Sequence, residues 1–267
     1  MTTPTPAFQN REAHIGDLVI PCIDVSRGAT TEPSAIPGLR NPSDVVEITR
    51  AYAAGNARKV FLDVFDTWEG IDYLPGLLRG IKDVGIDPLV SVEHGRLPSV
   101  QHLGDLLAAG ADVVSLSTAM VDDPQTVEAA VSEYGGERVM GVINSRRTGP
   151  GEWEAYVRDG EQPSGATAAS MADRFAGLRV GAILANSIDR EGTGQGFDLA
   201  LTRAVAEASG LPVIASGGCG TLQHLRDALR DGHATYVLVN KMVHDGKHSV
   251  AEIRDFLLAD SLYRPGH

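Results

Sequence analysis

The chain has 267 residues, of which 43% are hydrophobic, enough to build one large core. Its 23 Lys and Arg residues stand against 35 Asp and Glu residues, which gives a net charge of −12 at pH 7. Because a phosphate backbone requires a basic face on its partner, we expect no nucleic-acid partner. No apolar run approaches the roughly 18 residues of a membrane span, so we also expect no membrane partner.

The N-terminal sequence MTTPTPAFQNREAHIGD has no basic region followed by an apolar stretch, so it predicts no signal peptide. Its Thr and Pro content predicts a flexible leader over residues 1–16. Cys22 and Cys219 stand in apolar or Gly-rich contexts and do not form a paired framework. That usage is typical of the reducing cytoplasm, where we expect the protein to act.

Short apolar runs alternate with amphipathic stretches along the whole chain. Nearly continuous apolar runs predict strands that are buried on both faces of a parallel sheet. The amphipathic stretch at 43–55 predicts a helix that Ser43 caps and Gly55 ends. The predicted strands span residues 18–25, 59–64, 88–92, 112–117, 138–144, 181–187, 212–217 and 235–240.

Eight strands, each followed by a helix, predict an α/β protein of the (β/α)8 TIM barrel class. A doubly wound sheet is the structural alternative, but the number of strands favours a closed barrel. We expect this single domain to span residues 17–260, followed by a loose tail at 261–267. Residues 146–160 follow the fifth strand, and we expect them to form a small hairpin beside the barrel mouth.

Active sites of this fold lie at the C-terminal ends of the strands. The first predicted strand ends at Asp24 and the fifth at Asn144, although an amide neither gives nor takes a proton near neutral pH. The stretches VIPCIDVSRG and VMGVINSRRTG at these strands are alike. A half-length repeat would make the two residues opposite partners across the mouth, but any two barrel strands also look alike.

The stretch ASGGCGT follows the seventh strand and is rich in glycine. Gly217 and Gly218 leave backbone N–H groups free to approach an anion, and a helix that begins near Thr221 adds its dipole. Phosphate sites in this fold use the loops after strands seven and eight, although a tight turn without a ligand is the alternative. A second Gly-rich segment, residues 186–198, is either a mobile loop that contacts a ligand or hydrophilic cover.

The stretches PCIDV, VFLDV, ADVVSLSTAMVDDP, NSIDREGTGQGFD and VIASGGCG occur in this order over about residues 18–258. In these stretches the chain resembles the cyclase subunit of imidazole glycerol phosphate synthase, from the histidine-biosynthesis barrel family. The resemblance implies a barrel with a phosphate site at each side of its mouth. It also implies a phosphoribulosyl aminoimidazole carboxamide ribotide as substrate. This compound is cyclised and cleaved with ammonia from a glutaminase partner, giving an imidazole glycerol phosphate and an aminoimidazole nucleotide.

Asp24 matches the first of the family's two catalytic aspartates, and Asn144 stands where the second is expected. One proton-transfer role is therefore missing or has moved. The family's Gly-rich turn after strand three is here VEHGR, in which only Gly95 remains and Glu93 would repel an anion. Glu93 and His94 are candidates for the lost acid/base role, while His94 is equally well interpreted as a turn residue.

Further departures concern the first loop and the opposite end of the barrel. Glu32 falls about where the family has a lysine near the mouth. At the N-terminal end the family closes its ammonia entrance with a ring of two basic and two acidic side chains. The matching positions here are Leu18, Arg58, Val113 and Ala182. Because the ring is lost, we expect no glutaminase partner.

The retained positions predict a small phosphorylated substrate whose phosphate binds on the side of strands seven and eight. We expect a different group on the side of strand three, and neither a cofactor nor a metal ion. The predicted substrate-binding and phosphate-binding residues are Asp63, Gly95, Ser117, Thr118, Asn186, Asp189, Gly192, Gly217, Gly218, Asn240 and Lys241.

Our leading interpretation is a diverged, cytoplasmic member of this family in secondary metabolism. It would act on a sugar-phosphate or aminoimidazole-type nucleotide by acid/base cyclisation, lyase or isomerase chemistry, without channelled ammonia. Asp24 would be the general acid/base, and Asn144 an orienting or oxyanion-stabilising donor. Two alternatives remain open: an ordinary cyclase subunit of histidine biosynthesis, and a non-catalytic ligand-binding subunit.

Overall fold

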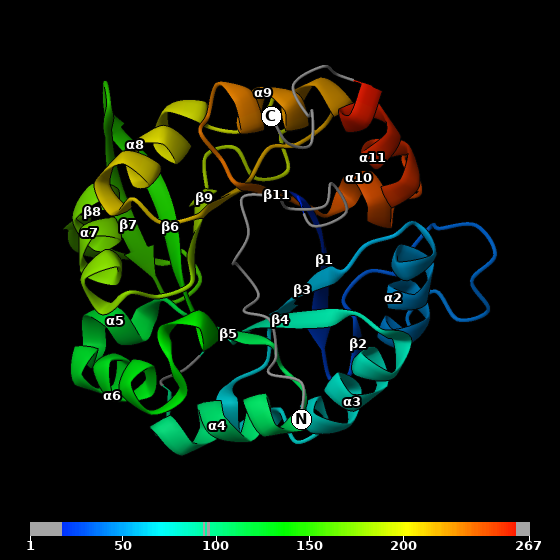
Figure 1. Ribbon diagram of the computed structural model, residues 1–267, viewed down its shortest axis with the longest axis horizontal. Helices are drawn as coiled ribbons and strands as arrows, with labels where there is room; N and C mark the ends of the chain where they lie inside the picture. The colour runs from blue at the N-terminus through cyan, green and yellow to red at the C-terminus, as the bar shows by residue number, and fades with distance from the viewer. Residues whose placement is uncertain (1–17, 93, 95–96, 260–267) are drawn as a thin grey trace, which may run out of the picture.

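A computed structural model of the protein describes residues 18–92, 94 and 97–259. Over these residues the chain is a single (β/α)8 TIM barrel, which confirms the predicted class. The helices form a ring around the strands (Figure 1). The expected leader and tail lie outside the described residues.

Eight parallel strands of the described chain close the barrel, and the last of them returns to pair with the first. In order around the barrel they are β1 (Val19–Ser26), β3 (Lys59–Val64), β4 (Asp87–Val92), β5 (Val113–Leu116), β6 (Val139–Gly149), β9 (Ala182–Ser187), β10 (Val213–Ser216) and β11 (Tyr236–Val239). Three strands separate β1 from β6 on either side, so these two strands lie opposite each other.

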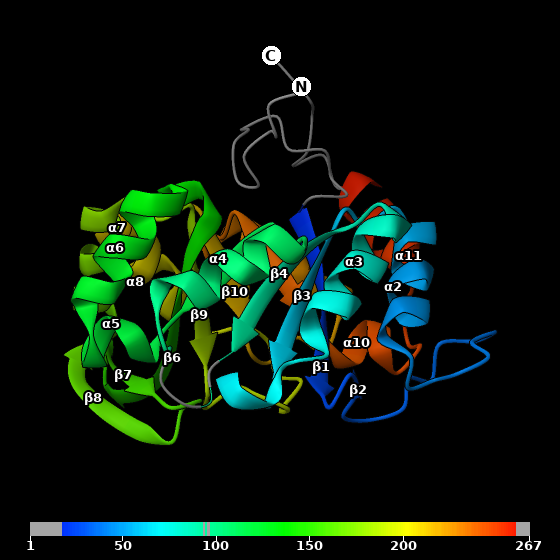
Figure 2. The ribbon, with the colours of Figure 1, turned by 90° about the horizontal axis from the view of Figure 1, so that it is seen from below.

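Shorter antiparallel strands extend the sheet at the mouth. The strand β2 (Ala29–Thr30) folds back on β1, while β7 (Glu152–Val157) and β8 (Gln162–Thr167) follow β6. Figure 2 shows these strands at the end of the barrel toward which the parallel strands point. The hairpin expected over residues 146–160 is present, and it continues through β8.

The helices of the described residues pack against the outside of the barrel. They are α2 (Val45–Ala54), α3 (Leu74–Val84), α4 (Val100–Ala109), α5 (Thr118–Asp122), α6 (Pro124–Tyr134), α7 (Ala168–Leu178), α8 (Leu199–Ser209), α9 (Leu222–Arg230), α10 (Lys241–His244) and α11 (Val250–Ala259), with short 3-10 turns η1 (Trp68–Gly70) and η2 (Gly136–Arg138). None of these described helices has the length and apolar character needed to cross a membrane.

The start of α2 differs by one residue from the prediction. Asp44, and not Ser43, caps the helix: its Oδ1 accepts hydrogen bonds from the backbone N–H groups of Val46 at 2.9 Å and Glu47 at 3.0 Å. Both residue types cap well, and here the extended backbone at the cap falls on the aspartate, whose charge also suits the helix N-terminus. Gly55 ends the helix as predicted.

The interior of the barrel changes from apolar to polar along each strand. Side chains alternate with a period of two, so every second residue faces inward. The apolar inward cluster consists of Ile20, Cys22, Phe61, Leu89, Val113, Met140, Val142, Ala182, Leu184, Ile214 and Tyr236. Two residues further along four of these strands stand Asp24, Asp63, Asn144 and Asn186. The polar end of the barrel is therefore its mouth.

Candidate active site

Asp24 stands half-buried at the mouth end of β1. Its Oδ1 accepts a hydrogen bond from Asn240 Nδ2 at 2.9 Å, and Cys22 Sγ donates to the same oxygen at 3.6 Å. Burial, with the nearby negative charge of Asp24, raises the pKa of the Cys22 thiol well above its usual value, so the thiol keeps its proton. The orientation of the Asp24 carboxylate is thus fixed by Asn240, directly after the neighbouring strand β11, and by Cys22 of its own strand β1.

Asn144 stands on the opposite wall, at the same level of β6. The register of β6 and β9 places it beside Asn186, and both side chains are buried. Asn186 Nδ2 donates to Asn144 Oδ1 at 2.9 Å. Since the oxygen of Asn144 is occupied, its two N–H groups are what this amide offers to a ligand in the mouth.

Glu191, a carboxylate of the Gly-rich segment 186–198, joins this pair of amides. Its Oε1 accepts a second hydrogen bond from Asn186 Nδ2, at 2.7 Å. Desolvation in the mouth, the largest cause, raises the pKa of the Glu191 carboxyl, and the negative charges of Asp159 and Asp24 act in the same direction. The one signal in the sequence was a carboxylate five residues after Asn186, inside the Gly-rich segment.

The turn between β7 and β8 is anchored across the mouth. Asp159 Oδ2 lies 3.3 Å from Nε2 of His94, which follows β4. The backbone N–H of Arg158 donates to Thr118 Oγ1 at 2.9 Å, and its guanidinium lies 2.9 Å from Asp122. Desolvation raises the pKa of the Asp159 carboxyl, although His94 opposes this shift. His94 therefore lies beside a carboxylate at the mouth, in the segment that follows β4.

The Gly-rich turn after β10 has a backbone conformation that favours glycine. Gly217 and Gly218 have φ angles of +86° and +96°, which favour glycine. A Cβ on Gly217 would lie 2.6 Å from Ser187 O, and one on Gly218 would press against Gly196 O. Without side chains at these two positions, backbone N–H groups can approach an anion closely, as a phosphate site requires.

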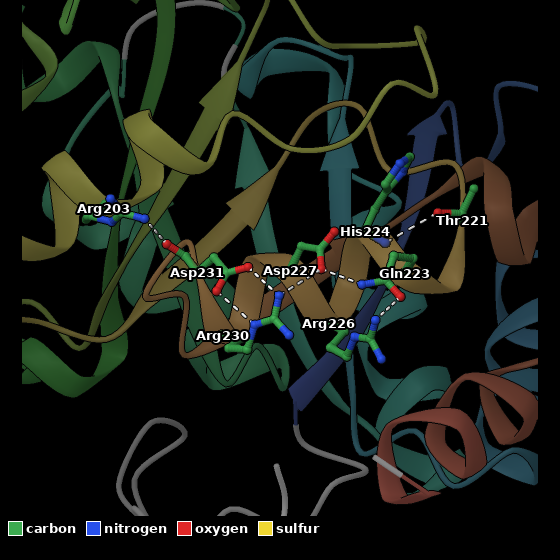
Figure 3. Close-up of polar contacts among 8 residues, drawn as sticks. All are labelled: Arg203, Thr221, Gln223, His224, Arg226, Asp227, Arg230 and Asp231. Carbon is green, nitrogen blue, oxygen red and sulfur yellow. Dashed lines mark hydrogen bonds and ion pairs between the residues drawn. The ribbon is translucent and has the colours of Figure 1, made fainter. Parts of the chain in front are cut away.

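The helix that follows this turn, α9, is well fixed. Thr221 Oγ1 accepts a hydrogen bond from the backbone N–H of His224 at 3.3 Å, and Gly220 N donates to His224 Nδ1 at 3.2 Å. Figure 3 shows Arg230 between Asp227 and Asp231, with Arg203 of α8 reaching the end of the helix. The helix N-terminus is therefore held beside the glycine turn, where its dipole favours an anion.

The other predicted site residues divide into several groups. Asp63 pairs in register with Asp24, and Ser117 is buried after β5. Asp189 accepts a hydrogen bond from the backbone N–H of Arg147 at 2.8 Å, so this carboxylate anchors the end of β6. Gly192 has a φ of +68° in the loop that carries Glu191. Glu93 and Gly95 lie outside the described residues.

A polar pocket opens beside Asp24, between the first loop and the end of β11. At the edge of this pocket, Lys241 Nζ lies 2.9 Å from Glu32 Oε2. The ion pair joins the first loop, which carries Glu32, to the segment after β11, which carries Lys241. The residues that line this pocket are Asp24, Thr30, Thr31, Glu32, Asn240, Lys241 and His244.

At the N-terminal end, the positions of the family's charged ring are mostly apolar and buried. Val113 and Ala182 belong to the cluster inside the barrel, and Leu18 is also buried. Arg58 is exposed. The neighbouring Lys59 is buried, with its Nζ 6.0 Å from the centre of the Tyr236 ring.

The family model described as "Histidine biosynthesis protein" matches residues 18–249. The chain belongs to this family. It is 39% identical over 249 residues to "Imidazole glycerol phosphate synthase subunit HisF" of Synechococcus sp. (strain CC9605), a match that covers 91% of this chain and 96% of that protein. The resemblance inferred from the motifs is thereby confirmed.

As a member of the histidine biosynthesis family, the protein is similar to a cyclase subunit over nearly its whole length. This similarity supports an enzyme of the cyclase type rather than a non-catalytic subunit. It also corrects the leading interpretation from the sequence. The comparisons give no support to a separate role in secondary metabolism, and the ordinary cyclase alternative fits them better.

Proposed function

We propose that the protein is a cyclase of the imidazole glycerol phosphate synthase type, acting on phosphoribulosyl aminoimidazole carboxamide ribotide with ammonia. The observation that carries this proposal is the 39% identity over 96% of the Synechococcus subunit. The geometry supports it, because Asp24 and the Gly217–Gly218 turn belong to the same barrel mouth. Such a site combines a carboxylate for proton transfer with a nest for phosphate.

In this reaction Asp24 is the general acid/base. Its Oδ1 is held by Asn240 and Cys22, and its Oδ2 is the oxygen left to exchange a proton with the substrate. Asn144, on the opposite strand, donates a hydrogen bond to the oxyanion that develops. The Gly217–Gly218 turn and the N-terminus of α9 hold one phosphate of the substrate.

The second phosphate of the substrate binds on the side of β4 and β5, where side chains replace the family's glycine-rich turn. Thr118 Oγ1 accepts from Arg158 N, so its own hydroxyl hydrogen is available to a ligand. Ser117 precedes it, and His94 stands across the mouth, where it carries a positive charge when protonated beside Asp159. These three residues offer donors on the side of strands β4 and β5.

We further infer that the ammonia arrives from solution. A docked glutaminase would deliver ammonia at the N-terminal end, where this chain has Leu18, Val113 and Ala182 in place of the family's charged residues. These three positions carry no charge, and the nearby Arg58 and Lys59 are both basic, so they do not rebuild a ring of two basic and two acidic side chains.

One observation favours a narrower second candidate, a diverged cyclase for a related phosphorylated substrate. Asn144 replaces the carboxylate that the family uses at strand five, so the order of proton transfers differs from the family's. The comparisons themselves do not favour this candidate.

The test is an assay with the family's ribotide substrate and ammonium chloride. We expect ammonium-dependent loss of the substrate and formation of an imidazole glycerol phosphate and an aminoimidazole nucleotide. If the substrate binds but is not converted at saturating ammonium, the proposed reaction is wrong and the second candidate takes its place.

A further inference from the structure

A chain of hydrogen bonds runs from the end of β6 to the loop above β9. Asn144 Oδ1 accepts from Asn186 Nδ2 at 2.9 Å, and Glu191 Oε1 accepts from the same nitrogen at 2.7 Å. We propose that Glu191 is the second acid/base residue of this site, positioned by Asn186, and that it performs the proton transfer that Asn144 cannot. This inference rests on the proposed cyclase function.

The geometry of Asn186 defines where the Glu191 carboxyl lies. Its Nδ2 has two hydrogens, and the two contacts use one each. If the Asn186 amide alone were turned over, its oxygen would face Asn144 Oδ1 at this distance, which is repulsive. The side chain is buried and its strand pairs with β6 and β10, so it has little freedom to move. Glu191 is thereby held at the wall opposite Asp24.

The charged groups around Glu191 come from three other elements. Asp159 faces it from the β7–β8 turn, Asp24 from β1 and Arg146 from β6. The two carboxylates favour the neutral form of Glu191, while Arg146 and the Asn186 hydrogen bond favour the charged form. Desolvation is the largest cause, and the net effect is a raised pKa. A larger fraction of Glu191 therefore carries a proton near neutral pH than of a surface glutamate.

The proton balance of the proposed step is simple. Neutral Glu191 gives its proton to a heteroatom of the substrate and becomes a carboxylate, while the Asp24 carboxylate takes a proton from the substrate on the other wall. The Glu191 residue is accessible to water at the outer side of its loop although its carboxyl is partly desolvated, so it regains a proton from water, and Asp24 returns its proton to solvent or product. One acid and one base on opposite sides of the reacting group are thus restored without an aspartate at position 144.

His94 is the rival for this role. It lies on the β4 side, with its Nε2 3.3 Å from Asp159 Oδ2. Among the described residues, no hydrogen bond links it to Asn144. The variant His94→Gln therefore separates the two candidates: we expect it to change KM for the substrate more than kcat.

The experiment is a cycle of variants, with kcat followed against pH on the ribotide substrate and ammonium chloride. Glu191→Gln should lower kcat by about 10²–10⁴-fold, the usual range for a general acid, and should remove the fall in activity at high pH that its deprotonation causes. Glu207→Gln, an exposed glutamate on α8, is the matched control and should leave kcat unchanged. Full activity in Glu191→Gln with its pH profile unchanged would overturn the inference.

Non-additivity of a second substitution distinguishes a proton-transfer role from a merely structural one. Asn144→Asp should lower kcat in the wild type, because it removes the amide donor and adds a like charge beside Glu191. In the Glu191→Gln background the same change should cost at least tenfold less in kcat, because it returns a carboxyl to the other end of the Asn186 bridge. Additive effects of the two substitutions would contradict a shared proton-transfer role.

A titration that needs no substrate separates this inference from the proposed function. The carboxyl carbon of Glu191, assigned by its loss in Glu191→Gln, is followed by NMR in the free protein. Its midpoint should lie above those of surface glutamates and should fall in Asp24→Asn. If the wild type shows this titration but does not convert the ribotide, the proposed cyclase function is wrong. The inference that Glu191 is the acid of this site then still stands. An ordinary midpoint that is insensitive to Asp24→Asn overturns the inference in either case.

Discussion

The side-chain nitrogen of Asn186 lies 2.9 Å from the side-chain oxygen of Asn144, on neighbouring strands in register. This contact commits the oxygen of Asn144 and turns its two N–H groups into the useful part of the side chain. The Asn144 amide is therefore hydrogen-bonded to Asn186. A carboxylate at position 144 would add a titratable group and would also remove the two N–H donors.

Asn144→Asp in the otherwise unchanged protein should reduce turnover of the ribotide near pH 7. The carboxylate cannot donate to a developing oxyanion, and where such a donor is central its loss costs about 2.7–4 kcal/mol of transition-state stabilisation, or roughly 10²–10³-fold in kcat. The measurement is kcat beside that of Asn144→Ser, which keeps a donor. A rise in kcat above the wild type would mean that the site still works with the family's pair of aspartates.

The phosphate nest is best tested at Cys219, between the glycines. Replacing Gly218 itself is a poor test, because a Cβ there would press on Gly196 O and disturb the loop. Cys219→Asp adds a negative charge without requiring a left-handed backbone, and repulsion of about 1–4 kcal/mol at close range should lower the affinity for inorganic phosphate by roughly tenfold or more. Calorimetry of the neutral variant Cys219→Asn provides the comparison. Equal affinities in the two variants would place the phosphate elsewhere.

Glutamine should not be a channelled source of ammonia for this protein. With Val113 and Ala182 apolar and buried inside the barrel, two of the family's four charged ring positions carry no charge here, so we expect a glutaminase not to dock productively. A mixture with a glutaminase and glutamine should turn over only as fast as the free ammonium released would allow. The check is the rate at matched free ammonium concentrations, and a faster rate with glutamine would indicate a channel.

Asp198 joins the β7–β8 extension to the barrel wall. Its Oδ2 accepts from Trp153 Nε1 at 2.9 Å and its Oδ1 caps α8 through the backbone N–H of Leu201 at 3.1 Å. Asp198→Ala should lower the free energy of unfolding by about 1–3 kcal/mol, through the lost cap and an unpaired indole N–H. Urea unfolding measures this change. Asp173→Ala, at an exposed position of α7, should stay within about 0.5 kcal/mol of the wild type.

The barrel was predictable because every parallel strand is a short apolar run between helical patterns. The predicted boundaries agree with the structure to within one or two residues, except at β6. That strand continues beyond Asn144 through Arg146 and Arg147, whose polar side chains end the hydrophobic signal while the backbone still pairs with β7. Hydrogen bonds between strands are made by the backbone, so they leave no trace in the apolar pattern there.

The site was predictable only in part. Position at a strand end and the alternation of inward residues were sufficient to place Asp24, Asn144 and Asn186 at the mouth. Glu191 was expected only as one of two carboxylates that a mobile loop could bring to a ligand. Its contact with Asn186 depends on how the loop folds back over β9, and no periodicity describes that path. The His94–Asp159 pair was missed for the same reason, since it joins two loops far apart in the sequence.

We propose that this barrel builds an imidazole ring with free ammonia, using Asp24 as acid/base. The most direct measurement is turnover of the ribotide with ¹⁵N-labelled ammonium by the wild type and by Asp24→Asn. We predict that the wild type places the label in imidazole glycerol phosphate and that Asp24→Asn is slower by about 10²–10⁴-fold. Label incorporation at the same rate by both proteins, or none by the wild type, would contradict the account.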